Sequence, residues 1–291
     1  MTDTLRKLFF FGPGYTAQTI KLVLNKNIND YGKWTFYGSV REENQSEHLR
    51  KINIQPVPFS EAEEALMNAD AILSSIPPKE NGDPVINHYR NLLATHCDTK
   101  WVGYLSTTGV YGNTDGAMVA ETAKLNPTHQ RSYRRVRAEK EWLDLNAHIF
   151  RLPGIYGIGR SAIERIKNGN NKSVLKRGHQ FSRIHVEDIA QTVISSLQKP
   201  NPGSIYNVCD DESAEPIDVD SFAAKLLGLD PPEAIPFDVA ILGMSKMAKS
   251  FWSDNRRVSN RKIKKELGIK LLHPTFREGL ETIHKAIQDK S

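Results

Sequence analysis

The sequence has little of what defines several special classes of protein. Its 291 residues include two cysteines, Cys97 and Cys209, which lie far apart and form no Cys-x-x-Cys pair. A disulfide scaffold is therefore excluded, and we expect two reduced, buried thiols and no metal site. The 19 glycines fall far short of the roughly one residue in three that collagen needs.

Long apolar runs are also absent. A transmembrane helix needs about 18 consecutive apolar residues. The longest apolar runs here are far shorter, such as residues 8–11. No hydrophobic secretory segment follows residues 1–7. We therefore expect a cytoplasmic protein without a membrane partner.

Positive charge is in modest excess and unevenly spread. Lys and Arg number 39 against 34 Asp and Glu, which gives a formal net charge of +5 and a pI near 9.0. Such an excess suits nucleic acid, a membrane surface or a phosphorylated small molecule. The densest basic stretch, residues 246–270, contains Phe251 and Trp252. Basic stretches with aromatic residues can bind single-stranded nucleic acid, but a solvated helix face is commoner, so nucleic acid ranks low as a partner.

Strand-like and helix-like segments alternate along the first half of the chain. Short apolar runs predict strands, and the amphipathic stretches between them predict helices. The expected strands are 7–11, 34–40, 52–59, 71–76, 101–106 and 148–152, and the expected helices are 16–24, 61–68, 85–95 and 131–145. This alternation predicts an α/β, Rossmann-type doubly wound parallel sheet. We assign residues 1–158 to a dinucleotide-binding core and 159–291 mainly to a smaller substrate-side lobe, with 183–210 returning to the sheet.

A glycine-containing loop, residues 12–17, lies directly between the first expected strand and the first expected helix. Glycine tolerates the backbone angles of a tight turn, and a second glycine lets the backbone approach a pyrophosphate. The helix N-terminus adds free N–H groups and a positive dipole end. We therefore expect Gly12, Gly14, Tyr15 and Thr16 to contact a dinucleotide. The alternative is a tight turn without a ligand.

The end of the second expected strand bears on the type of dinucleotide. An NAD-selective site places Asp or Glu there to bind the ribose 2′-hydroxyl. This chain has Ser39 and Arg41 at that point. A guanidinium binds a phosphate group through two parallel hydrogen bonds. We therefore predict NADP rather than NAD, the alternatives being NAD as cofactor and an ordinary surface role for Arg41.

Four segments resemble a known family in the order in which that family carries them. They are Leu105–Gly112, Arg151–Gly157, Ile184–Ala190 and Ile205–Val208. The first two resemble the Ser-Ser-x-x-Val-Tyr-Gly and Arg-Pro-x-x-Tyr-Gly signatures of the extended and atypical short-chain dehydrogenase/reductases, the branch of nucleotide-sugar epimerases and dehydratases. The third resembles the His-Val-x-Asp-Val-Ala segment of that branch. The resemblance covers nearly the whole chain and implies an NAD(P)-dependent enzyme with further cofactor contacts at Ser75, Pro153 and Ile155.

The resemblance also implies a catalytic hydroxyl, a tyrosine and a lysine beside the nicotinamide. Counting back from the Val-Tyr-Gly run places Thr107 at the hydroxyl position, although a strand-end threonine can equally satisfy a backbone group. In one register of the following helix Tyr133 is the acid–base residue and Arg137 stands at the lysine position. In a second register Arg131 and Arg135 occupy the two positions, and Tyr133 drops out. Both registers remain open at this point.

Two functions follow from these observations. The first is an NADP-dependent oxidoreductase or epimerase-like enzyme acting on a small polar substrate such as a nucleotide sugar, with Thr107, Tyr133 and Arg137 as its catalytic residues. The second is a non-catalytic NADP(H)-binding sensor or scaffold that lacks the Tyr-Lys pair. The sequence is compatible with a monomer or a homodimer. His185 suits a helix-capping role at a strand-to-helix junction.

Overall fold

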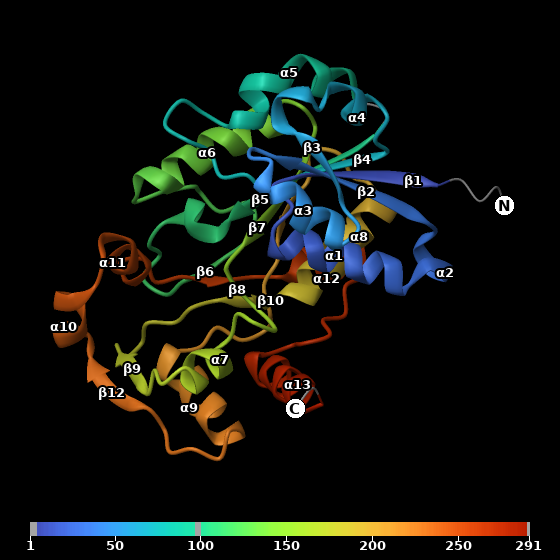
Figure 1. The fold of residues 1–291 in the computed structure, drawn as a ribbon. Helices are drawn as coiled ribbons and strands as arrows, with labels where there is room; N and C mark the ends of the chain where they lie inside the picture. The colour runs from blue at the N-terminus through green and yellow to red at the C-terminus, as the bar shows by residue number, and fades with distance from the viewer. Residues whose placement is uncertain (1–4, 97–99, 290–291) are drawn as a thin grey trace.

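A seven-stranded parallel sheet forms the centre of the protein (Figure 1). The structure is a computed structural model that describes residues 5–96 and 100–289, so the expectation for Cys97 lies outside the described residues. The strand order is β11-β7-β5-β4-β1-β2-β3. The strands are β1 (Arg6–Phe11), β2 (Trp34–Val40), β3 (Gln55–Pro58), β4 (Ala71–Ser74), β5 (Trp101–Thr107), β7 (His148–Leu152) and β11 (Ile205–Asn207). The predicted Rossmann-type α/β class is confirmed.

The central strand shows why an unbroken apolar run forms a strand here. Leu8 and Phe10 pack into the core on one face of the sheet, and Phe9 and Phe11 pack into the core on the other. Because successive side chains of a strand point to opposite faces, a strand covered on both sides needs apolar residues at every position.

Helices cover both faces of the sheet. One face is covered by α1 (Tyr15–Lys26), α3 (Asn44–Lys51), α8 (Val186–Gln198) and α12 (Arg261–Leu267), with α2 (Ile28–Tyr31) nearby. The other is covered by α4 (Glu63–Met67), α5 (Pro84–His96) and α6 (Gln130–Leu143). Among the helices of the described residues, none is both long and apolar enough to cross a membrane.

The remaining elements form a lobe beside the sheet and the segments that join it to the core (Figure 1). They are β6 (Met118–Val119), β8 (Gly154–Tyr156), α7 (Ala162–Lys167), β9 (Lys172–Leu175), β10 (Arg183–His185), α9 (Pro216–Leu226), β12 (Glu233–Pro236), α10 (Phe237–Ala240), α11 (Lys246–Trp252), β13 (Arg257–Val258) and α13 (Phe276–Gln288), with short 3-10 turns at η1 (Phe59–Glu61), η2 (Thr108–Tyr111) and η3 (Ile241–Gly243). Helices α7, α9 and α13 pack around a small apolar core of their own.

Two segments of the second half, residues 183–210 and the basic stretch 246–270, are each divided between different parts of the fold. Within 183–210, β11 joins the seven-stranded sheet beside β7, whereas β10 pairs with β8 in a separate two-stranded sheet. The basic stretch 246–270 is divided among α11, β13 and α12. Gly268, with φ of +71°, ends α12 in the left-handed conformation expected of a glycine C-cap.

Cys209 is a buried, free thiol, as predicted.

Candidate functional site

Two cavities meet at the carboxyl edge of the sheet, where open α/β sheets bind their ligands. The first has a volume of about 630 Å³ and lies against the loop between β1 and α1. The second, of about 520 Å³, lies at the end of β5 and under α11. Pro77 lines both cavities, so the two lie next to each other.

The glycine loop forms one wall of the first cavity. Gly12 has φ of +76°, and a Cβ there would lie 2.9 Å from the Ser75 hydroxyl, so the position accepts only glycine. Gly14 caps α1 with its backbone in an extended conformation, and a Cβ added there would find no atom nearer than 3.9 Å. Within the described chain no side chain caps the first N–H groups of α1, and its first turn carries no acidic residue. Free N–H groups beside open space at a helix N-terminus suit a pyrophosphate.

Polar and basic side chains line part of the first cavity. Ser39 accepts a hydrogen bond from the backbone N–H of Gly12 at 3.2 Å, so its hydroxyl ties β2 to the loop. Arg41 is exposed and lines the same cavity. The lining also includes Gln45, His48, Phe59 and Lys79, which sequence reasoning did not single out. Arg41 and Lys79 are positively charged, so this cavity favours an anion.

The other expected cofactor contacts fall into two groups. Ser75 lines the first cavity and donates its hydroxyl to the Gly12 carbonyl oxygen at 2.6 Å. Pro153 lines the second cavity. Tyr15, Thr16 and Ile155 line neither of the two. Tyr15 donates its hydroxyl to the Ile158 carbonyl oxygen at 3.0 Å, and burial raises the pKa of Tyr15 to about 12. The side chain of Thr16 is buried, and Ile155 packs against the apolar core.

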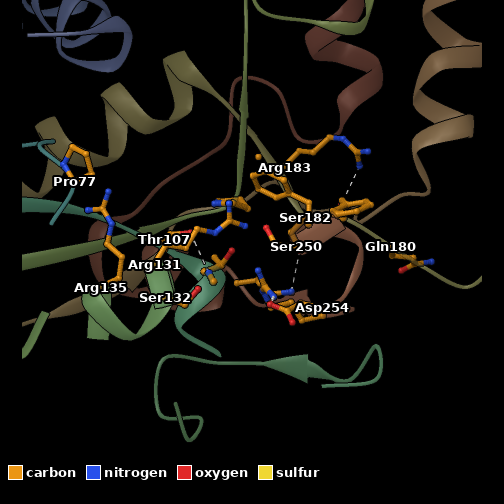
Figure 2. A pocket seen from close by; sticks show the side chains of 18 of the residues that line it. Pro77, Thr107, Arg131, Ser132, Arg135, Gln180, Ser182, Arg183, Ser250 and Asp254 are labelled. Atoms are coloured by element: carbon orange, nitrogen blue, oxygen red, sulfur yellow. Dashed lines mark hydrogen bonds and ion pairs between the residues drawn. The ribbon is translucent and has the colours of Figure 1, made fainter. Parts of the chain in front are cut away.

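Thr107 stands at the carboxyl end of β5, in the wall of the second cavity (Figure 2). Its hydroxyl oxygen accepts a hydrogen bond from the Gly109 backbone N–H at 3.1 Å. A hydroxyl that already accepts this bond still has its own proton to donate. Thr107 therefore combines the structural role of capping η2 with a free O–H beside the cavity.

Four arginines line the second cavity: Arg131, Arg135, Arg183 and Arg256. Arg256 forms an ion pair with Asp254 at 3.1 Å, while the other three form no ion pair with any carboxylate of the described residues. The guanidinium of Arg131 lies 4.3 Å from the centre of the Phe251 ring. Figure 2 shows Arg131 and Arg135 on the same side of the cavity as Thr107. The cavity thus carries an excess of positive charge that suits an anionic ligand.

Arg135 is held in place from behind. Its guanidinium donates hydrogen bonds to the Tyr104 hydroxyl at 2.6 Å and to the Leu105 carbonyl oxygen at 3.0 Å. Tyr104 stacks on Trp142 with 5.3 Å between ring centres. The indole of Trp142 in turn donates to the buried Asp83 carboxylate at 3.2 Å. A guanidinium anchored in this way keeps its position without a ligand, which is what pre-organised binding requires.

The two registers proposed for the helix at 131–145 differ in what they bring to this cavity. Arg131 and Arg135 line it, together with the buried hydroxyl of Ser132. Tyr133 is 55% exposed and lies outside the lining of both cavities. Arg137 is also exposed and pairs with Glu141 at 3.0 Å on the outer surface of α6. The geometry therefore groups Thr107 with Arg131 and Arg135 rather than with Tyr133 and Arg137.

A buried polar network lies beneath the second cavity and uses the family-like motifs. Arg151 donates to both oxygens of Glu139, and Glu139 accepts the Ser106 hydroxyl at 2.6 Å. Arg151 also donates to the Tyr111 hydroxyl at 2.8 Å, which donates to Asn207 at 2.7 Å. The Arg151–Glu139 ion pair joins β7 to α6, and the hydrogen bonds around it extend the network to β5, η2 and β11. These motif residues position the strand ends at the cavity rather than lining it.

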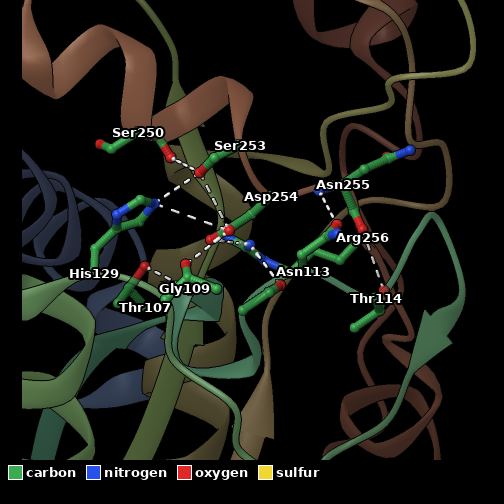
Figure 3. Close-up of polar contacts among 12 residues, drawn as sticks. Thr107, Gly109, Asn113, Thr114, His129, Ser250, Ser253, Asp254, Asn255 and Arg256 are labelled. Carbon is green, nitrogen blue, oxygen red and sulfur yellow. Dashed lines mark hydrogen bonds and ion pairs between the residues drawn. The ribbon is translucent and has the colours of Figure 1, made fainter.

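The segment after α11, which contributes Asp254 and Arg256 to the wall of the second cavity, is fastened by several polar contacts (Figure 3). The ring of His129 lies 2.7 Å from the Ser253 hydroxyl, and Asp254 accepts the Thr128 hydroxyl at 2.8 Å. The Asn255 backbone N–H donates to Asn113 at 2.8 Å, and Arg256 donates to the Gly112 carbonyl oxygen at 3.0 Å. Part of the basic stretch therefore faces this cavity instead of solvent. The sequence shows the mixed basic and aromatic composition of this stretch, but it does not show that the stretch packs against the second cavity.

Comparison with known proteins finds similar chains in other bacteria. No family model matches it. It is 30% identical to Protein YeeZ of Escherichia coli (strain K12) over 198 residues, which are 64% of this chain and 69% of that protein. It is 41% identical to a functionally unknown conserved protein from Silicibacter pomeroyi DSS, with a TM-score of 0.88 over 97% of this chain and 99% of the other.

The fold also matches an enzyme of known activity. A dTDP-glucose 4,6-dehydratase from Bacillus anthracis, solved in complex with NAD, superposes with a TM-score of 0.75 over 98% of this chain and 97% of its own. At 16% identity this likeness establishes the fold alone. The chain therefore shares the fold of this dehydratase, and it belongs to the same family as Escherichia coli Protein YeeZ.

Proposed function

We propose that the protein binds NADP(H) in the first cavity and acts on a small anionic substrate, such as a nucleotide sugar, in the second, as an oxidoreductase or epimerase-like enzyme. The observation that carries this proposal is that the two cavities are neighbours and share Pro77 in their walls. One contains the glycine loop and the N-terminus of α1, and the other contains the Thr107 hydroxyl beside two arginines.

The glycine loop supports the cofactor part of the proposal. The tight turn at Gly12 and the open side of Gly14 leave backbone N–H groups free to bind a pyrophosphate. The dehydratase that shares the fold was solved with NAD, which makes a nicotinamide dinucleotide the natural ligand of this wall. We extend the preference to NADP because Arg41, His48 and Lys79 all line this cavity, and a guanidinium suits a ribose 2′-phosphate.

Hydride transfer to or from the nicotinamide is the chemistry that the cofactor supplies when it is bound. In the second cavity the Thr107 hydroxyl would donate a hydrogen bond to the reacting oxygen of the substrate. Arg131 and Arg135 would stabilise negative charge on that oxygen, because a positioned guanidinium strengthens its interaction as the charge develops. Neither arginine is a practical acid, since a guanidinium stays protonated in proteins. The proton would therefore come from a hydroxyl or from solvent.

The same argument supports the substrate class. Three of the four arginines of the second cavity have no carboxylate partner among the described residues, so a ligand with phosphate or carboxylate groups would offset their charge. A nucleotide sugar carries a diphosphate and is the substrate type named for the dehydratase of the same fold. We would place its phosphates beside the arginines that have no carboxylate partner among the described residues.

One observation favours a second function, a sensor or scaffold that binds NADP(H) without catalysis. Among the described residues that line the second cavity, none is a tyrosine, lysine or histidine. The carboxylate in this lining, Asp254, is held in an ion pair with Arg256. A site whose one described acid–base residue is paired in this way is expected to bind cofactor yet turn over slowly or not at all.

Cofactor titration tests the proposal directly. We expect NADPH to bind more tightly than NADH, as followed by nicotinamide fluorescence. Arg41→Ala should weaken NADPH binding by about tenfold to a hundredfold, the usual contribution of a charged hydrogen bond, and leave NADH binding unchanged. Arg50→Ala is the control, since Arg50 is an exposed arginine outside this cavity. Tighter binding of NADH would contradict the NADP preference, and binding of neither would contradict the function as a whole.

Turnover distinguishes the enzyme from the sensor. A panel of nucleotide sugars is incubated with the protein and NADP(H). Net redox is followed by the absorbance of NADPH, and epimerisation, which returns its hydride, is followed by analysis of the sugar products. A product formed at a rate that Thr107→Val abolishes supports the enzyme. Tight NADPH binding without any product across the panel supports the sensor.

A further inference from the structure

A second hydroxyl lies beside Thr107 in the second cavity. Ser132 stands in the first turn of α6, its side chain is 3% exposed, and it lines the cavity. Figure 2 shows Ser132 on the same side of the cavity as Thr107 and Arg131. The function proposed above gives this hydroxyl no role.

Gly109 lies between the two hydroxyls. It belongs to η2, which packs against α6, and it lines the same cavity. A Cβ atom built on Gly109 would lie 3.1 Å from the Ser132 Oγ atom and 3.4 Å from the Thr107 Oγ1 atom. Both hydroxyls therefore border the open side of one glycine. Two hydroxyls placed in this way can reach two neighbouring oxygens of one small ligand, because each hydrogen bond spans about 2.7–2.8 Å.

The backbone does not explain the glycine at this position. Gly109 is not among the described glycines with a positive φ, so its backbone angles are open to other residues. A side chain there would instead crowd the hydroxyls of Ser132 and Thr107. The lack of a side chain at Gly109 is thus better explained by access to these two hydroxyls than by the geometry of the turn.

The hydroxyl of Ser132 is free to bind a ligand. Among the described residues it has no hydrogen-bond partner, whereas the two other serines of the lining do. Ser250 donates its hydroxyl to the Met247 carbonyl oxygen at 2.7 Å. Ser182 shares a hydrogen bond with the Ser213 hydroxyl at 2.9 Å. Since buried polar groups are usually hydrogen-bonded, an unpartnered hydroxyl in the wall of a cavity suits a ligand.

The neighbours of Ser132 place it next to the reacting part of the substrate. Ser132 and Arg135 are three positions apart on α6, so their side chains are neighbours on the helix surface. The function proposed above places Thr107 and Arg135 at the reacting oxygen. A donor beside both of them would meet the next polar atom along the substrate. In a sugar that atom is the hydroxyl oxygen on the carbon next to the reacting carbon.

Thr108 is the alternative to Ser132. It lines the same cavity, and its hydroxyl also lacks a partner among the described residues. However, η2 carries no arginine, whereas Ser132 shares α6 with two arginines that line the cavity. We therefore assign the role to Ser132 and use Thr108 as a test of that choice.

We propose that Ser132 is a substrate-binding residue that hydrogen-bonds the hydroxyl on the carbon next to the reacting carbon. Thr107 then binds the reacting oxygen and Ser132 its neighbour, while Gly109 leaves room for both. The substrate would accordingly carry oxygens on two adjacent carbons, as sugars do and simple ketones do not. This inference rests on the proposed function and narrows its substrate class.

Substrate preference tests the role, on the nucleotide sugar that the panel identifies. Its kcat/KM is compared with those of two analogues, each of which lacks the hydroxyl on one carbon next to the reacting carbon. We expect the wild type to disfavour one analogue by about tenfold, the contribution of one hydrogen bond. Ser132→Ala should lower kcat/KM for the parent sugar by about tenfold and should no longer distinguish it from that analogue.

Two controls separate this contact from a general disturbance of the cavity. Ser250→Ala removes a lining hydroxyl that is already bonded within α11, so the wild-type preference should remain. Thr108→Val removes the other free hydroxyl and should also keep the preference. Circular dichroism and NADPH titration establish that each variant folds and binds cofactor.

Gly109→Ala is a second, independent variant. Its methyl group would lie against both hydroxyls, so we expect kcat/KM for the nucleotide sugar to fall at least about tenfold. Wild-type kinetics in a folded Gly109→Ala protein would argue against a ligand at this point.

The outcomes distinguish this role from the function on which it rests. If Ser132→Ala slows the parent sugar and both analogues by the same factor, the role is overturned. It is also overturned if the preference disappears in Thr108→Val and persists in Ser132→Ala. In both cases the proposed enzyme function stands. If no sugar of the panel is turned over, the role of Ser132 and the enzyme function fall together.

Discussion

The guanidinium of Arg151 donates hydrogen bonds to both carboxylate oxygens of Glu139, and each side chain is 2% exposed. Through Ser106, Tyr111 and Asn207 this ion pair connects the strand ends on which the second cavity is built. Burial of two charges is tolerated here because nearly every polar atom of the pair finds a partner. The pair therefore gives residues of the family-like motifs a structural role behind the cavity, while Thr107 and Pro153 of the same motifs line it.

Removal of Arg151 should destabilise the protein severely. Arg151→Gln leaves the Glu139 carboxylate buried without a countercharge, so we expect the free energy of unfolding to fall by about 3–5 kcal/mol. Arg137→Gln makes the same change in an exposed pair on α6, where the loss should stay below about 1 kcal/mol. Denaturation in urea measures both. Equal losses for the two variants would contradict the role assigned to the buried pair.

The two glycines of the loop should respond differently to alanine. Gly12→Ala forces a side chain into a left-handed position against Ser75, and we expect it to lower stability by about 1–3 kcal/mol. Gly14→Ala has room within the protein, so its stability should change by no more than about 0.5 kcal/mol. Its methyl group would instead obstruct a pyrophosphate, with NADPH affinity falling at least about tenfold. A Gly14→Ala protein that binds NADPH normally would argue against the proposed cofactor position.

Substitutions on α6 distinguish the two registers of the catalytic helix. On the nucleotide sugar that the panel identifies, Arg131→Ala and Arg135→Ala should each lower turnover by about a hundredfold or more, the scale reported by removal of a group that stabilises an oxyanion. Tyr133→Phe, on the exposed side of the same helix, should leave turnover unchanged. Loss of turnover in Tyr133→Phe with little effect of the arginine variants would instead support Tyr133 and Arg137.

The pH dependence of stability should report a buried histidine in the lobe. His179 packs between Phe181 and Trp252, and burial lowers the pKa of His179 to about 4. Between about pH 6.5 and pH 4 the unfolded chain binds a proton at this position and the folded chain does not, so stability falls as the pH falls through this range. One such group contributes a slope of up to about 1.4 kcal/mol per pH unit.

The variant His179→Gln should reduce this slope. The free energy of unfolding is measured by urea denaturation at a series of pH values from 4 to 7. Comparison with His88→Gln, a change at an exposed histidine, accounts for the loss of a histidine as such. An unchanged slope in His179→Gln would show that other groups, such as His185, carry the pH dependence.

The proposed site illustrates the limits of reasoning from sequence. The glycine loop was found because Gly12 and Gly14 stand two residues apart between a strand and a helix, and Thr107 was found from the strand it ends. The register of α6 stayed open because helical periodicity says which residues share a face but not which face meets the cavity. Arg256 and Phe251 were not identified as residues that line the cavity, because no local pattern indicates that residues 250–256 pack near the end of β5.

The sequence by itself determined the alternation of strands and helices, the parallel sheet, the glycine loop after the first strand and the family-like motifs. These depend on residue type and on neighbours within about one or two turns or strands. Only the tertiary structure decided that Arg131 and Arg135 face the second cavity while Tyr133 faces solvent, and that Thr107 and Ser132 meet around Gly109. Such meetings depend on how distant segments pack, because side-chain convergence across elements is set by the whole fold and leaves no periodic signal in the chain.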